Sequence, residues 1–256
     1  MSLTQPLPKP RPLAKEQLDQ FRTEGYVLLG AVLDRRALEQ LREQEARLRE
    51  VKLRWDPSLA TQTVFISQVC HYAEPVRHCC VAGPHVPLVQ QLIGPDVALW
   101  FNQFVTKNPD GDSGRSEFPW HQDNGYVAVD PPTNVTVWIA LDDVDQHNGC
   151  VWVMPRSHER GLLDHRKKSE DNWHLTVPVE GDGVPVPLKA GEAVAFTGLT
   201  LHRSKLNHGS RPRRAFFIEY AQADARCARP DEPWQPLTSH PNTWIVSGAA
   251  PLPDDF

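Results

Sequence analysis

The sequence lacks an apolar run long enough to cross a membrane, and it lacks an excess of basic residues. A membrane-spanning helix needs about 20 consecutive, mainly apolar residues, and polar residues interrupt every apolar stretch before that length. The chain of 256 residues has 27 Lys and Arg against 32 Asp and Glu, a formal net charge of -5. Nucleic-acid-binding domains are typically basic. The composition therefore predicts neither a membrane nor a nucleic acid as a partner.

Cysteine is also scarce. A disulfide framework uses an even number of cysteines at regular spacing, and this chain has five, unevenly placed: Cys70, Cys79, Cys80, Cys150 and Cys227. The histidines near Cys79 and Cys80 do not match the spacing of a structural zinc site. The first residues lack the apolar segment of a signal peptide. Together these features predict a cytoplasmic protein with reduced, buried thiols.

Proline, by contrast, is abundant: the 24 prolines disfavour long helices and favour short strands joined by structured loops. Apolar residues recur with a helical period at residues 13–23, 34–51 and 86–92, and residues 26–29 are expected to form a strand. From Val97 the period changes to two. Expected strands then follow at residues 97–105, 133–141, 150–154, 193–196 and 215–220. This order predicts a mainly β fold with flanking helices, a double-stranded β-helix of the jelly-roll, cupin-like kind.

The expected helix at residues 34–51 has a clear start and a clear apolar face. Asp34 is a favourable N-cap residue, and Leu38 and Leu41 lie on one side. We expect the Arg and Glu residues of this helix to form a solvated face.

The chain is expected to form a single domain over residues 13–256. Residues 1–12 contain four prolines and are expected to form a flexible arm. Residues 161–188 are expected to be an insertion or lid, and the proline-rich residues 221–256 a covering segment.

The segment Trp120-His121-Gln122-Asp123 is the strongest chemical signal. In an extended backbone, side chains at i and i+2 point to the same face, so the His121 imidazole and the Asp123 carboxylate would converge. His202 is the best candidate for a third ligand. Two histidines and a carboxylate form the facial triad typical of non-heme Fe(II), with positions left open for O2 and a co-substrate. The competing interpretation is that these are ordinary polar residues at strand ends.

Two arginines follow His202 and enter the expected strand at residues 215–220. A guanidinium that faces a metal cavity offers a planar, bidentate clamp for a carboxylate. Arg213 and Arg214 are both candidates, and a structural ion pair is the alternative role.

With these residues, the sequence resembles the phytanoyl-CoA dioxygenase (PhyH) family of Fe(II)- and 2-oxoglutarate-dependent oxygenases. The resemblance rests on four motifs in the family's order: residues 120–123; Trp138 within residues 135–142; residues 148–158; and His202 with Ser204, Asn207 and Ser210. The family spacing places the essential arginine at Arg213. Arg156 departs from the family's usual glycine. Halogenating relatives have Gly or Ala where this chain has Asp123, so the carboxylate favours oxygenation.

The resemblance implies the cofactors and their ligands. His121, Asp123 and His202 are expected to bind Fe(II), and these three residues with Arg213 form the expected catalytic set. Arg213 is expected to pair with the distal carboxylate of 2-oxoglutarate, assisted by Ser204. Trp138 and Gln103 are expected to line the co-substrate pocket, although a tryptophan on a sheet is often plain core. O2 completes the reactants.

The resemblance also implies hydroxylation of an unactivated C–H of a small molecule, with release of succinate and CO2. The same residues could serve desaturation, cyclisation or epimerisation, and a non-catalytic cupin-like binding protein is a further alternative. Substrate contacts are expected from Trp120, Asn124, Tyr126 and Trp173. The sequence leaves open whether Lys107 or the basic run at residues 166–168 contacts a ligand, which substrate is used, and which oligomer forms.

Overall fold

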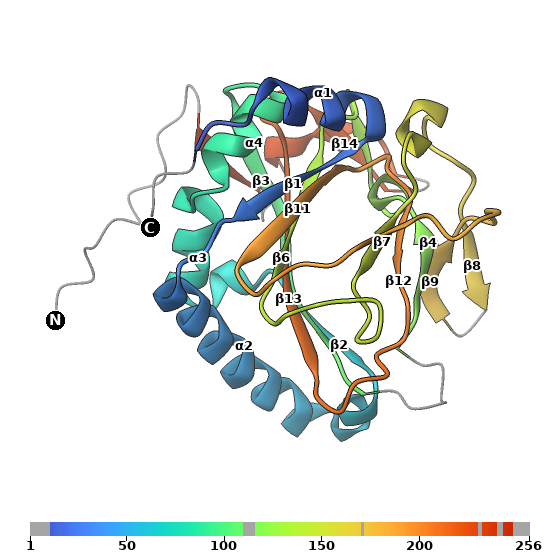
Figure 1. Ribbon diagram of the computed structural model, residues 1–256. Coiled ribbons are helices and arrows are strands. Elements are labelled where there is room, and N and C mark those ends of the chain that lie inside the picture. The colour runs from blue at the N-terminus through green and yellow to red at the C-terminus, as the bar shows by residue number, and fades with distance from the viewer. Residues whose placement is uncertain (1–10, 110–115, 170–171, 230–231, 240–242, 248–256) are drawn as a thin grey trace, which may run out of the picture.

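The computed structural model describes residues 11–109, 116–169, 172–229, 232–239 and 243–247. The expected arm at residues 1–12 therefore lies almost wholly outside the described residues. The described α-helices are α1 (Lys15–Glu24), α2 (Arg35–Trp55), α3 (Glu74–Ala82) and α4 (Val86–Ile93). They cover one side of the molecule (Figure 1).

Local sequence signals set the ends of the first two helices. Gly25 ends α1 in the left-handed conformation with φ 82°, which glycine adopts without steric cost. The Asp34 carboxylate accepts a hydrogen bond of 2.8 Å from the Ala37 amide and so caps α2. The sequence did not predict α3, which has a proline in its first turn and buries Val76, Cys79 and Cys80. Its few residues show too little periodicity to be recognised.

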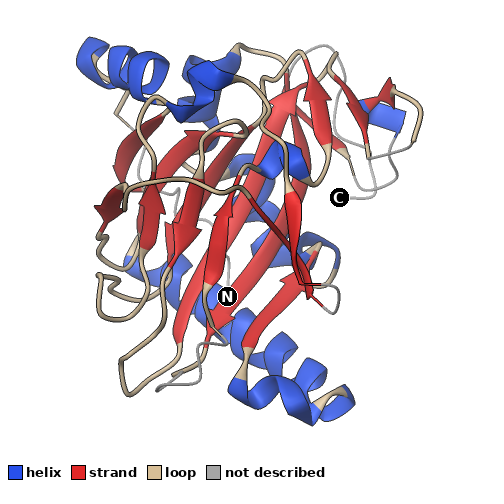
Figure 2. Cartoon of the chain, turned by 90° about the vertical axis from the view of Figure 1, so that its right-hand side faces the viewer, coloured by secondary structure: helices blue, strands red, loops and turns tan. Residues whose placement is uncertain are grey.

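The strands form two principal antiparallel sheets, which confirms the expected mainly β fold. A seven-stranded sheet has the order β1-β11-β6-β13-β3-β16 with β2 also paired to β3, and a four-stranded sheet has the order β10-β7-β12-β4. Their bounds are β1 Tyr26–Ala31, β2 Thr63–Ser67, β3 Val97–Lys107, β4 Phe118–His121, β6 Val135–Ala140, β7 Val151–Val153, β10 Val184–Val186, β11 Glu192–Thr197, β12 His202–Ser204, β13 Arg213–Gln222 and β16 Trp244–Ser247. Figure 2 shows the strands side by side with helices outside them.

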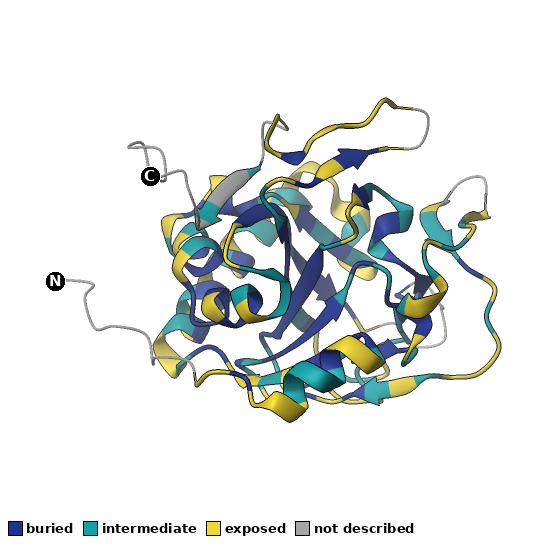
Figure 3. Ribbon diagram, turned by 90° about the horizontal axis from the view of Figure 1, so that it is seen from above, coloured by how far each residue is buried: buried dark blue, intermediate teal, exposed yellow. Residues whose placement is uncertain are grey.

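Strand β6 shows how the two sides of the large sheet differ. Val135, Val137 and Ile139 belong to the apolar core shared with the helices. Trp138 and Ala140, on the other face, belong to the core shared with the four-stranded sheet. Every residue of β6 is buried, and Figure 3 shows such buried strands inside a shell of half-exposed helices. The space between the two sheets is therefore lined by alternate residues of the central strands.

One expectation about α2 is wrong, because Glu45 is fully buried and does not belong to a solvated face. Its carboxylate accepts a hydrogen bond of 2.5 Å from the Thr106 hydroxyl and pairs with Arg49 at 2.8 Å. Arg214 approaches it at 4.0 Å. Burial of this charge is tolerated because its partners come from the same helix and from two strands of the sheet beneath.

The two segments expected to lie outside the core take part in the sheets. Within residues 161–188, β8 (Arg166–Ser169) and β9 (Asn172–Thr176) form a hairpin, whereas β10 belongs to the four-stranded sheet. Within residues 221–256, β14 (Arg226–Ala228) pairs with β5 (Ala128–Asp130) and with β15 (Gln235–Pro236), and β16 extends the large sheet. All five cysteines are buried and unpaired. No helix among the described residues is long and apolar enough to span a bilayer.

His85 is expected to make the free energy of unfolding depend on pH. Burial lowers the pKa of this fully buried imidazole to about 3 from 6.5, and its Nε2 contacts the Tyr220 hydroxyl at 2.8 Å. Because the unfolded chain takes up this proton below pH 6.5 and the folded chain does not, its contribution is complete above pH 6.5 and is lost as pH falls towards 3. We expect His85→Gln to flatten the loss of unfolding free energy by up to about 1.4 kcal/mol per pH unit.

The measurement is urea unfolding at several pH values between 6.5 and 4. Tyr220→Phe is the control, because it removes the hydroxyl contact but keeps the imidazole and hence the slope. Parallel profiles for the native chain and His85→Gln would contradict the prediction.

Candidate iron and co-substrate site

The two histidines of the expected triad are brought together by strand pairing. His202 on β12 is the direct cross-strand partner of His121 on β4. Residues opposite each other in an antiparallel pair present their side chains on the same face, and the two imidazole centroids lie 4.1 Å apart. Both residues are buried.

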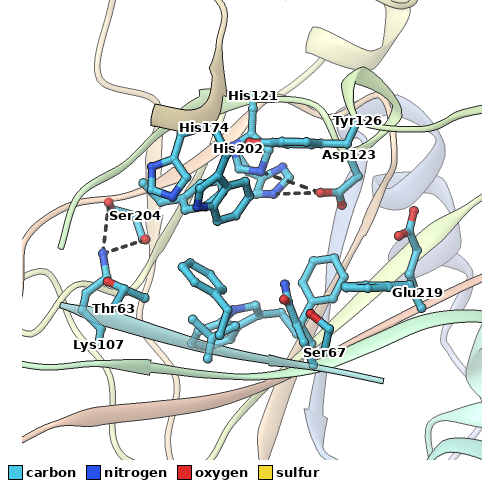
Figure 4. A pocket seen from close by; sticks show the side chains of 18 of the residues that line it. Thr63, Ser67, Lys107, His121, Asp123, Tyr126, His174, His202, Ser204 and Glu219 are labelled. Carbon is cyan, nitrogen blue, oxygen red and sulfur yellow. Dashed lines mark hydrogen bonds and ion pairs between the residues drawn. The ribbon is translucent and has the colours of Figure 1, made fainter. Parts of the chain in front are cut away.

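Asp123 joins them from a turn, not from the strand that the i, i+2 argument assumed. It is the first residue of the 3₁₀ turn η3 (Asp123–Gly125). Gln122 before it is still extended, with φ -111° and ψ 142°. The side chains of His121 and Asp123 therefore still point to the same face. Asp123 Oδ1 lies 3.7 Å from His121 Nε2 and 3.5 Å from His202 Nε2. Figure 4 shows the three side chains converging on the cavity.

The hydrogen bonds of the three side chains leave the inward atoms free to coordinate. His121 Nδ1 contacts the Pro119 carbonyl at 2.8 Å, and His202 Nδ1 contacts the Thr200 carbonyl at 3.0 Å. A carbonyl only accepts, so each Nδ1 carries the proton and each Nε2 keeps its lone pair. Asp123 Oδ2 accepts a hydrogen bond of 2.7 Å from the Thr136 hydroxyl, which leaves Oδ1 facing the histidines.

The electrostatics also suit a divalent cation. Burial, and then the neighbouring His202, hold the pKa of His121 well below its usual value. Burial raises the pKa of Asp123, an effect that His202 and the Thr136 hydrogen bond partly offset. The contacts of Asp123 with the neutral His121 imidazole are therefore not an ion pair. Among the described residues these three form the one group of possible metal ligands whose atoms all lie within 4.8 Å.

Gln122 fixes the ligand segment from behind, a role that sequence reasoning missed. Its side-chain amide donates to the carbonyls of Gly161 and Leu199, at 2.8 and 2.6 Å, and its carbonyl accepts from the Leu163 amide at 2.8 Å. Its own backbone N–H donates to His165 Nε2 at 2.9 Å. The available signal for this role was the position of the glutamine between the two expected ligands. Its side chain binds the segment to the loops that contain Gly161, Leu163 and Leu199.

Arg213 is a buried guanidinium with unused donors. It is only 2% exposed, and Nη2 donates to the Gly149 carbonyl at 2.6 Å. Nε and Nη1 have no hydrogen-bond partner among the described residues. Burial lowers the pKa of Arg213 to about 10, and its guanidinium carbon lies 5.3 Å from the centre of the Trp138 ring. Arg214 points to the other side of the sheet, where it binds Asp142 at 2.7 Å.

Lys107 is the second buried cation and the cross-strand partner of Arg213. It is 1% exposed and lines the cavity. Its Nζ donates to the Ser204 hydroxyl at 2.8 Å (Figure 4) and to the Lys205 carbonyl at 2.5 Å. The Ser204 hydroxyl thus binds Lys107 and not Arg213, because Lys107 reaches across from β3 to β12. Lys107, which the sequence left open, contacts the pocket.

The triad opens into a cavity of about 1210 Å³ between the sheets. Several residues that the sequence singled out line it, namely Gln103, Tyr126, Trp138, Trp173 and Ser204. Of the basic run at residues 166–168, Lys168 lines the cavity and pairs with Glu117 at 3.1 Å.

Two expected substrate residues do not line this cavity. Trp120 precedes His121 on β4 and therefore faces the opposite way, where its ring lies 4.7 Å from the Arg203 guanidinium. Asn124 is buried in η3, and its backbone N–H donates to the Gly198 carbonyl at 3.1 Å. Neither position suits direct contact with a ligand in the cavity.

Phe65, Phe118 and Glu219 also line the cavity, and the sequence did not single them out. Phe65, Phe118 and Trp173 pack edge to face at centroid distances between 5.4 and 5.8 Å. Glu219 on β13 accepts a hydrogen bond of 2.6 Å from the Asn134 amide. Burial, and then the charge of Asp123, raise the pKa of Glu219 to about 8.

These residues fit a ferrous ion and a dicarboxylate co-substrate. Two imidazole nitrogens and one carboxylate oxygen on one side of a point form the donor set of a facial triad. The unpartnered donors of Arg213 suit a planar carboxylate, and Lys107 adds a second positive charge beside it. Burial of two cations side by side is costly, and an anionic ligand would offset part of that cost.

Comparison with known proteins assigns the chain to a family. The phytanoyl-CoA dioxygenase (PhyH) family model matches residues 21–215, most of the chain. A phytanoyl-CoA dioxygenase of Arabidopsis thaliana is 33% identical over 108 residues, 41% of this chain and 38% of that protein. Phytanoyl-CoA dioxygenase 1 of Oryza sativa subsp. japonica is 25% identical over 83% of this chain and 90% of its own length.

Solved structures share the fold. The non-heme monooxygenase ThoJ superposes with a TM-score of 0.72 at 25% identity and covers 91% of this chain and 84% of its own. The α-ketoglutarate-dependent carbocyclase SnoK, from nogalamycin biosynthesis, has a TM-score of 0.69 at 22% identity, with 85% and 87% covered. The jelly-roll fold, the converging triad and the family match agree: this chain belongs to the phytanoyl-CoA dioxygenase family of non-heme iron(II)- and 2-oxoglutarate-dependent oxygenases.

Proposed function

We propose that this protein hydroxylates an unactivated C–H bond of a small-molecule substrate and releases succinate and CO2 from 2-oxoglutarate. The observation that carries the proposal is a His-Asp-His triad that shares one cavity with a buried guanidinium, two of whose nitrogen atoms have no hydrogen-bond partner among the described residues. A non-catalytic binding protein has no chemical need for both features at once.

His121, Asp123 and His202 would hold the iron, and their outer hydrogen bonds would fix their direction. Ferrous iron, once bound, would couple the oxidative decarboxylation of 2-oxoglutarate to oxygenation of the substrate. The Pro119 and Thr200 carbonyls keep both imidazoles in the tautomer that coordinates through Nε2.

Arg213 would bind the distal carboxylate of 2-oxoglutarate through Nε and Nη1, the two donors without a protein partner. Lys107, held by Ser204, would supply a second charge at the same end. The Trp138 ring lies 5.3 Å from the guanidinium carbon of Arg213. Gln103 lines the same cavity. These residues orient the keto acid and do not themselves react.

The aromatic residues Phe65, Phe118 and Trp173 form an aromatic roof over the cavity. This roof would exclude water and admit the substrate. Trp173 lies on the β8–β9 hairpin, lines the cavity and is 57% exposed. Tyr126, which follows the turn η3, accepts a hydrogen bond of 2.9 Å from the backbone N–H of Leu175 on the same hairpin. The hairpin is thereby connected to the turn that carries Asp123. We assign substrate contacts to Tyr126 and Trp173.

A second outcome on the same residues is desaturation, cyclisation or epimerisation. Among the structures with this fold, one is described as a carbocyclase and another as an epimerase from nogalamycin biosynthesis. Succinate release screened across a panel of metabolites, with mass analysis of each product, separates the outcomes: hydroxylation adds one oxygen atom, and the alternatives add none.

Removal of Asp123 should abolish the iron site. In an anaerobic titration with Fe(II) and 2-oxoglutarate, the native chain is expected to develop the weak visible charge-transfer band of the chelate, and Asp123→Ala is not. Thr136→Val keeps all three ligands but loses the hydrogen bond to Asp123. It should retain the band with about 10- to 100-fold weaker metal affinity. A band of equal strength in Asp123→Ala would refute the assignment.

Arg213→Lys should weaken 2-oxoglutarate binding although the charge is kept. Lysine is a point charge and cannot form the paired hydrogen bonds of a guanidinium, so the Kd for 2-oxoglutarate should rise at least about ten-fold. Titration of the same band measures it. Arg214→Lys is the matched control, because Arg214 faces Asp142 on the other side of the sheet. Equal effects from both variants would remove Arg213 from the co-substrate site.

A further inference from the structure

Two buried residues of opposite charge type, Arg213 and Glu219, face the cavity from different parts of strand β13. Side chains of alternate residues point to the same face, and Arg213, Phe217 and Glu219 all line the cavity. The guanidinium and the carboxylate are thus separated by about 20 Å of extended strand. Lys107 lies at the Arg213 end, opposite Glu219, and the triad lies between the two ends (Figure 4). Two buried cations, Lys107 and Arg213, therefore lie at one end of this strand, and the buried acid Glu219 lies towards the other.

Glu219 is an acid without a basic partner. It is 6% exposed, lines the cavity and accepts one hydrogen bond, from the neutral amide of Asn134. No Lys, Arg or His in the described part of the chain forms an ion pair with it. The other two acids that line the cavity differ, because Asp123 belongs to the triad and Glu117 pairs with Lys168.

A basic nitrogen of a ligand would supply the ion-pair partner that Glu219 lacks among the described residues. Burial, and then the charge of Asp123, raise the pKa of Glu219 to about 8 because they disfavour the charged carboxylate. A cation bound beside Glu219 would offset this cost, and the dianionic co-substrate would bind at the opposite end, beside Arg213 and Lys107. Aromatic rings adjoin Glu219: Phe101 is its cross-strand partner, and Phe217 packs against Phe101 at 6.1 Å. Tyr126 lines the same space. Ring faces attract alkylammonium groups.

We propose that Glu219, oriented by Asn134, binds the protonated amine of the substrate, and that the substrate is an amine with an apolar or aromatic body. This inference rests on the proposed function, since it places the substrate in the cavity beside the iron. Glu219 lies at the Asp123 end (Figure 4), so an amine held there directs its neighbouring carbon atoms towards the triad. The aromatic roof covers the rest of the molecule.

A matched pair of probes tests the charge. 2-Phenylethylamine and 2-phenylethanol have the same carbon skeleton and differ in an ammonium and a hydroxyl group. Binding of each is measured by calorimetry at pH 7.5 to the anaerobic protein loaded with Fe(II) and 2-oxoglutarate. The native chain should bind the amine at least ten-fold more tightly than the alcohol. Glu219→Gln, which keeps shape and hydrogen bonding, should reduce that ratio to within about three-fold while the affinity for the alcohol is unchanged.

Two further variants keep the inference falsifiable. Glu117→Gln removes the rim carboxylate that already has a lysine partner, and it should preserve the preference for the amine. Asn134→Ala leaves the charge but frees the Glu219 side chain, and it should reduce the preference by a smaller factor than Glu219→Gln. Equal binding of both probes by the native chain, or a preference that survives in Glu219→Gln and Asn134→Ala, overturns the inference.

The charge-transfer band separates this inference from the proposed function. It is recorded on the same samples before each probe is added. A band in both the native chain and Glu219→Gln, without any preference for the amine, means that the oxygenase site is correct and the substrate class is wrong. A native chain without the band overturns the proposed function, whichever probe binds.

Discussion

The pairing of β4 with β12 is the interaction on which the site depends. It sets His121 opposite His202 and thereby brings together two ligands that are distant in the sequence. Antiparallel register permits no gradual adjustment, because a slip of either strand by one residue would turn its histidine to the other face. The turn after β4 then needs only one extended residue, Gln122, to bring the Asp123 carboxylate into the same space. The metal site is therefore a consequence of sheet register.

The large sheet performs a separate task with its central strands. On β6 and β13, residues of one face pack against the helices, and residues of the other face line the cavity. The face towards the cavity carries Trp138, Arg213 and Glu219. The apolar core on one side of the sheet thus positions the buried cation Arg213 and the buried acid Glu219 on the other side. Specificity can change at a single alternate position without disturbing the packing behind it.

The sequence predicted what is encoded locally and missed what depends on pairing across the fold. Triad convergence was predictable because His121 and Asp123 are near neighbours and the motif order supplied His202. The mainly β fold followed from the change of period at Val97. Whether Lys107 points inward depends on its register opposite Arg213, which no local pattern contains. The burial of Glu45 depends in the same way on Thr106 and on arginines that approach from two elements.

Under the proposed function, the position of Lys107 opposite Arg213 would link folding to the supply of 2-oxoglutarate. Like charges directly opposite on neighbouring strands repel each other, and here both are almost fully buried. Under the proposed function, the dicarboxylate 2-oxoglutarate would bind beside them and offset this repulsion in the folded chain alone. The folded state would then gain stability by mass action as the keto acid accumulates. Abundance of the protein in a cell would then follow the supply of its own co-substrate, with no regulator beyond the ligand.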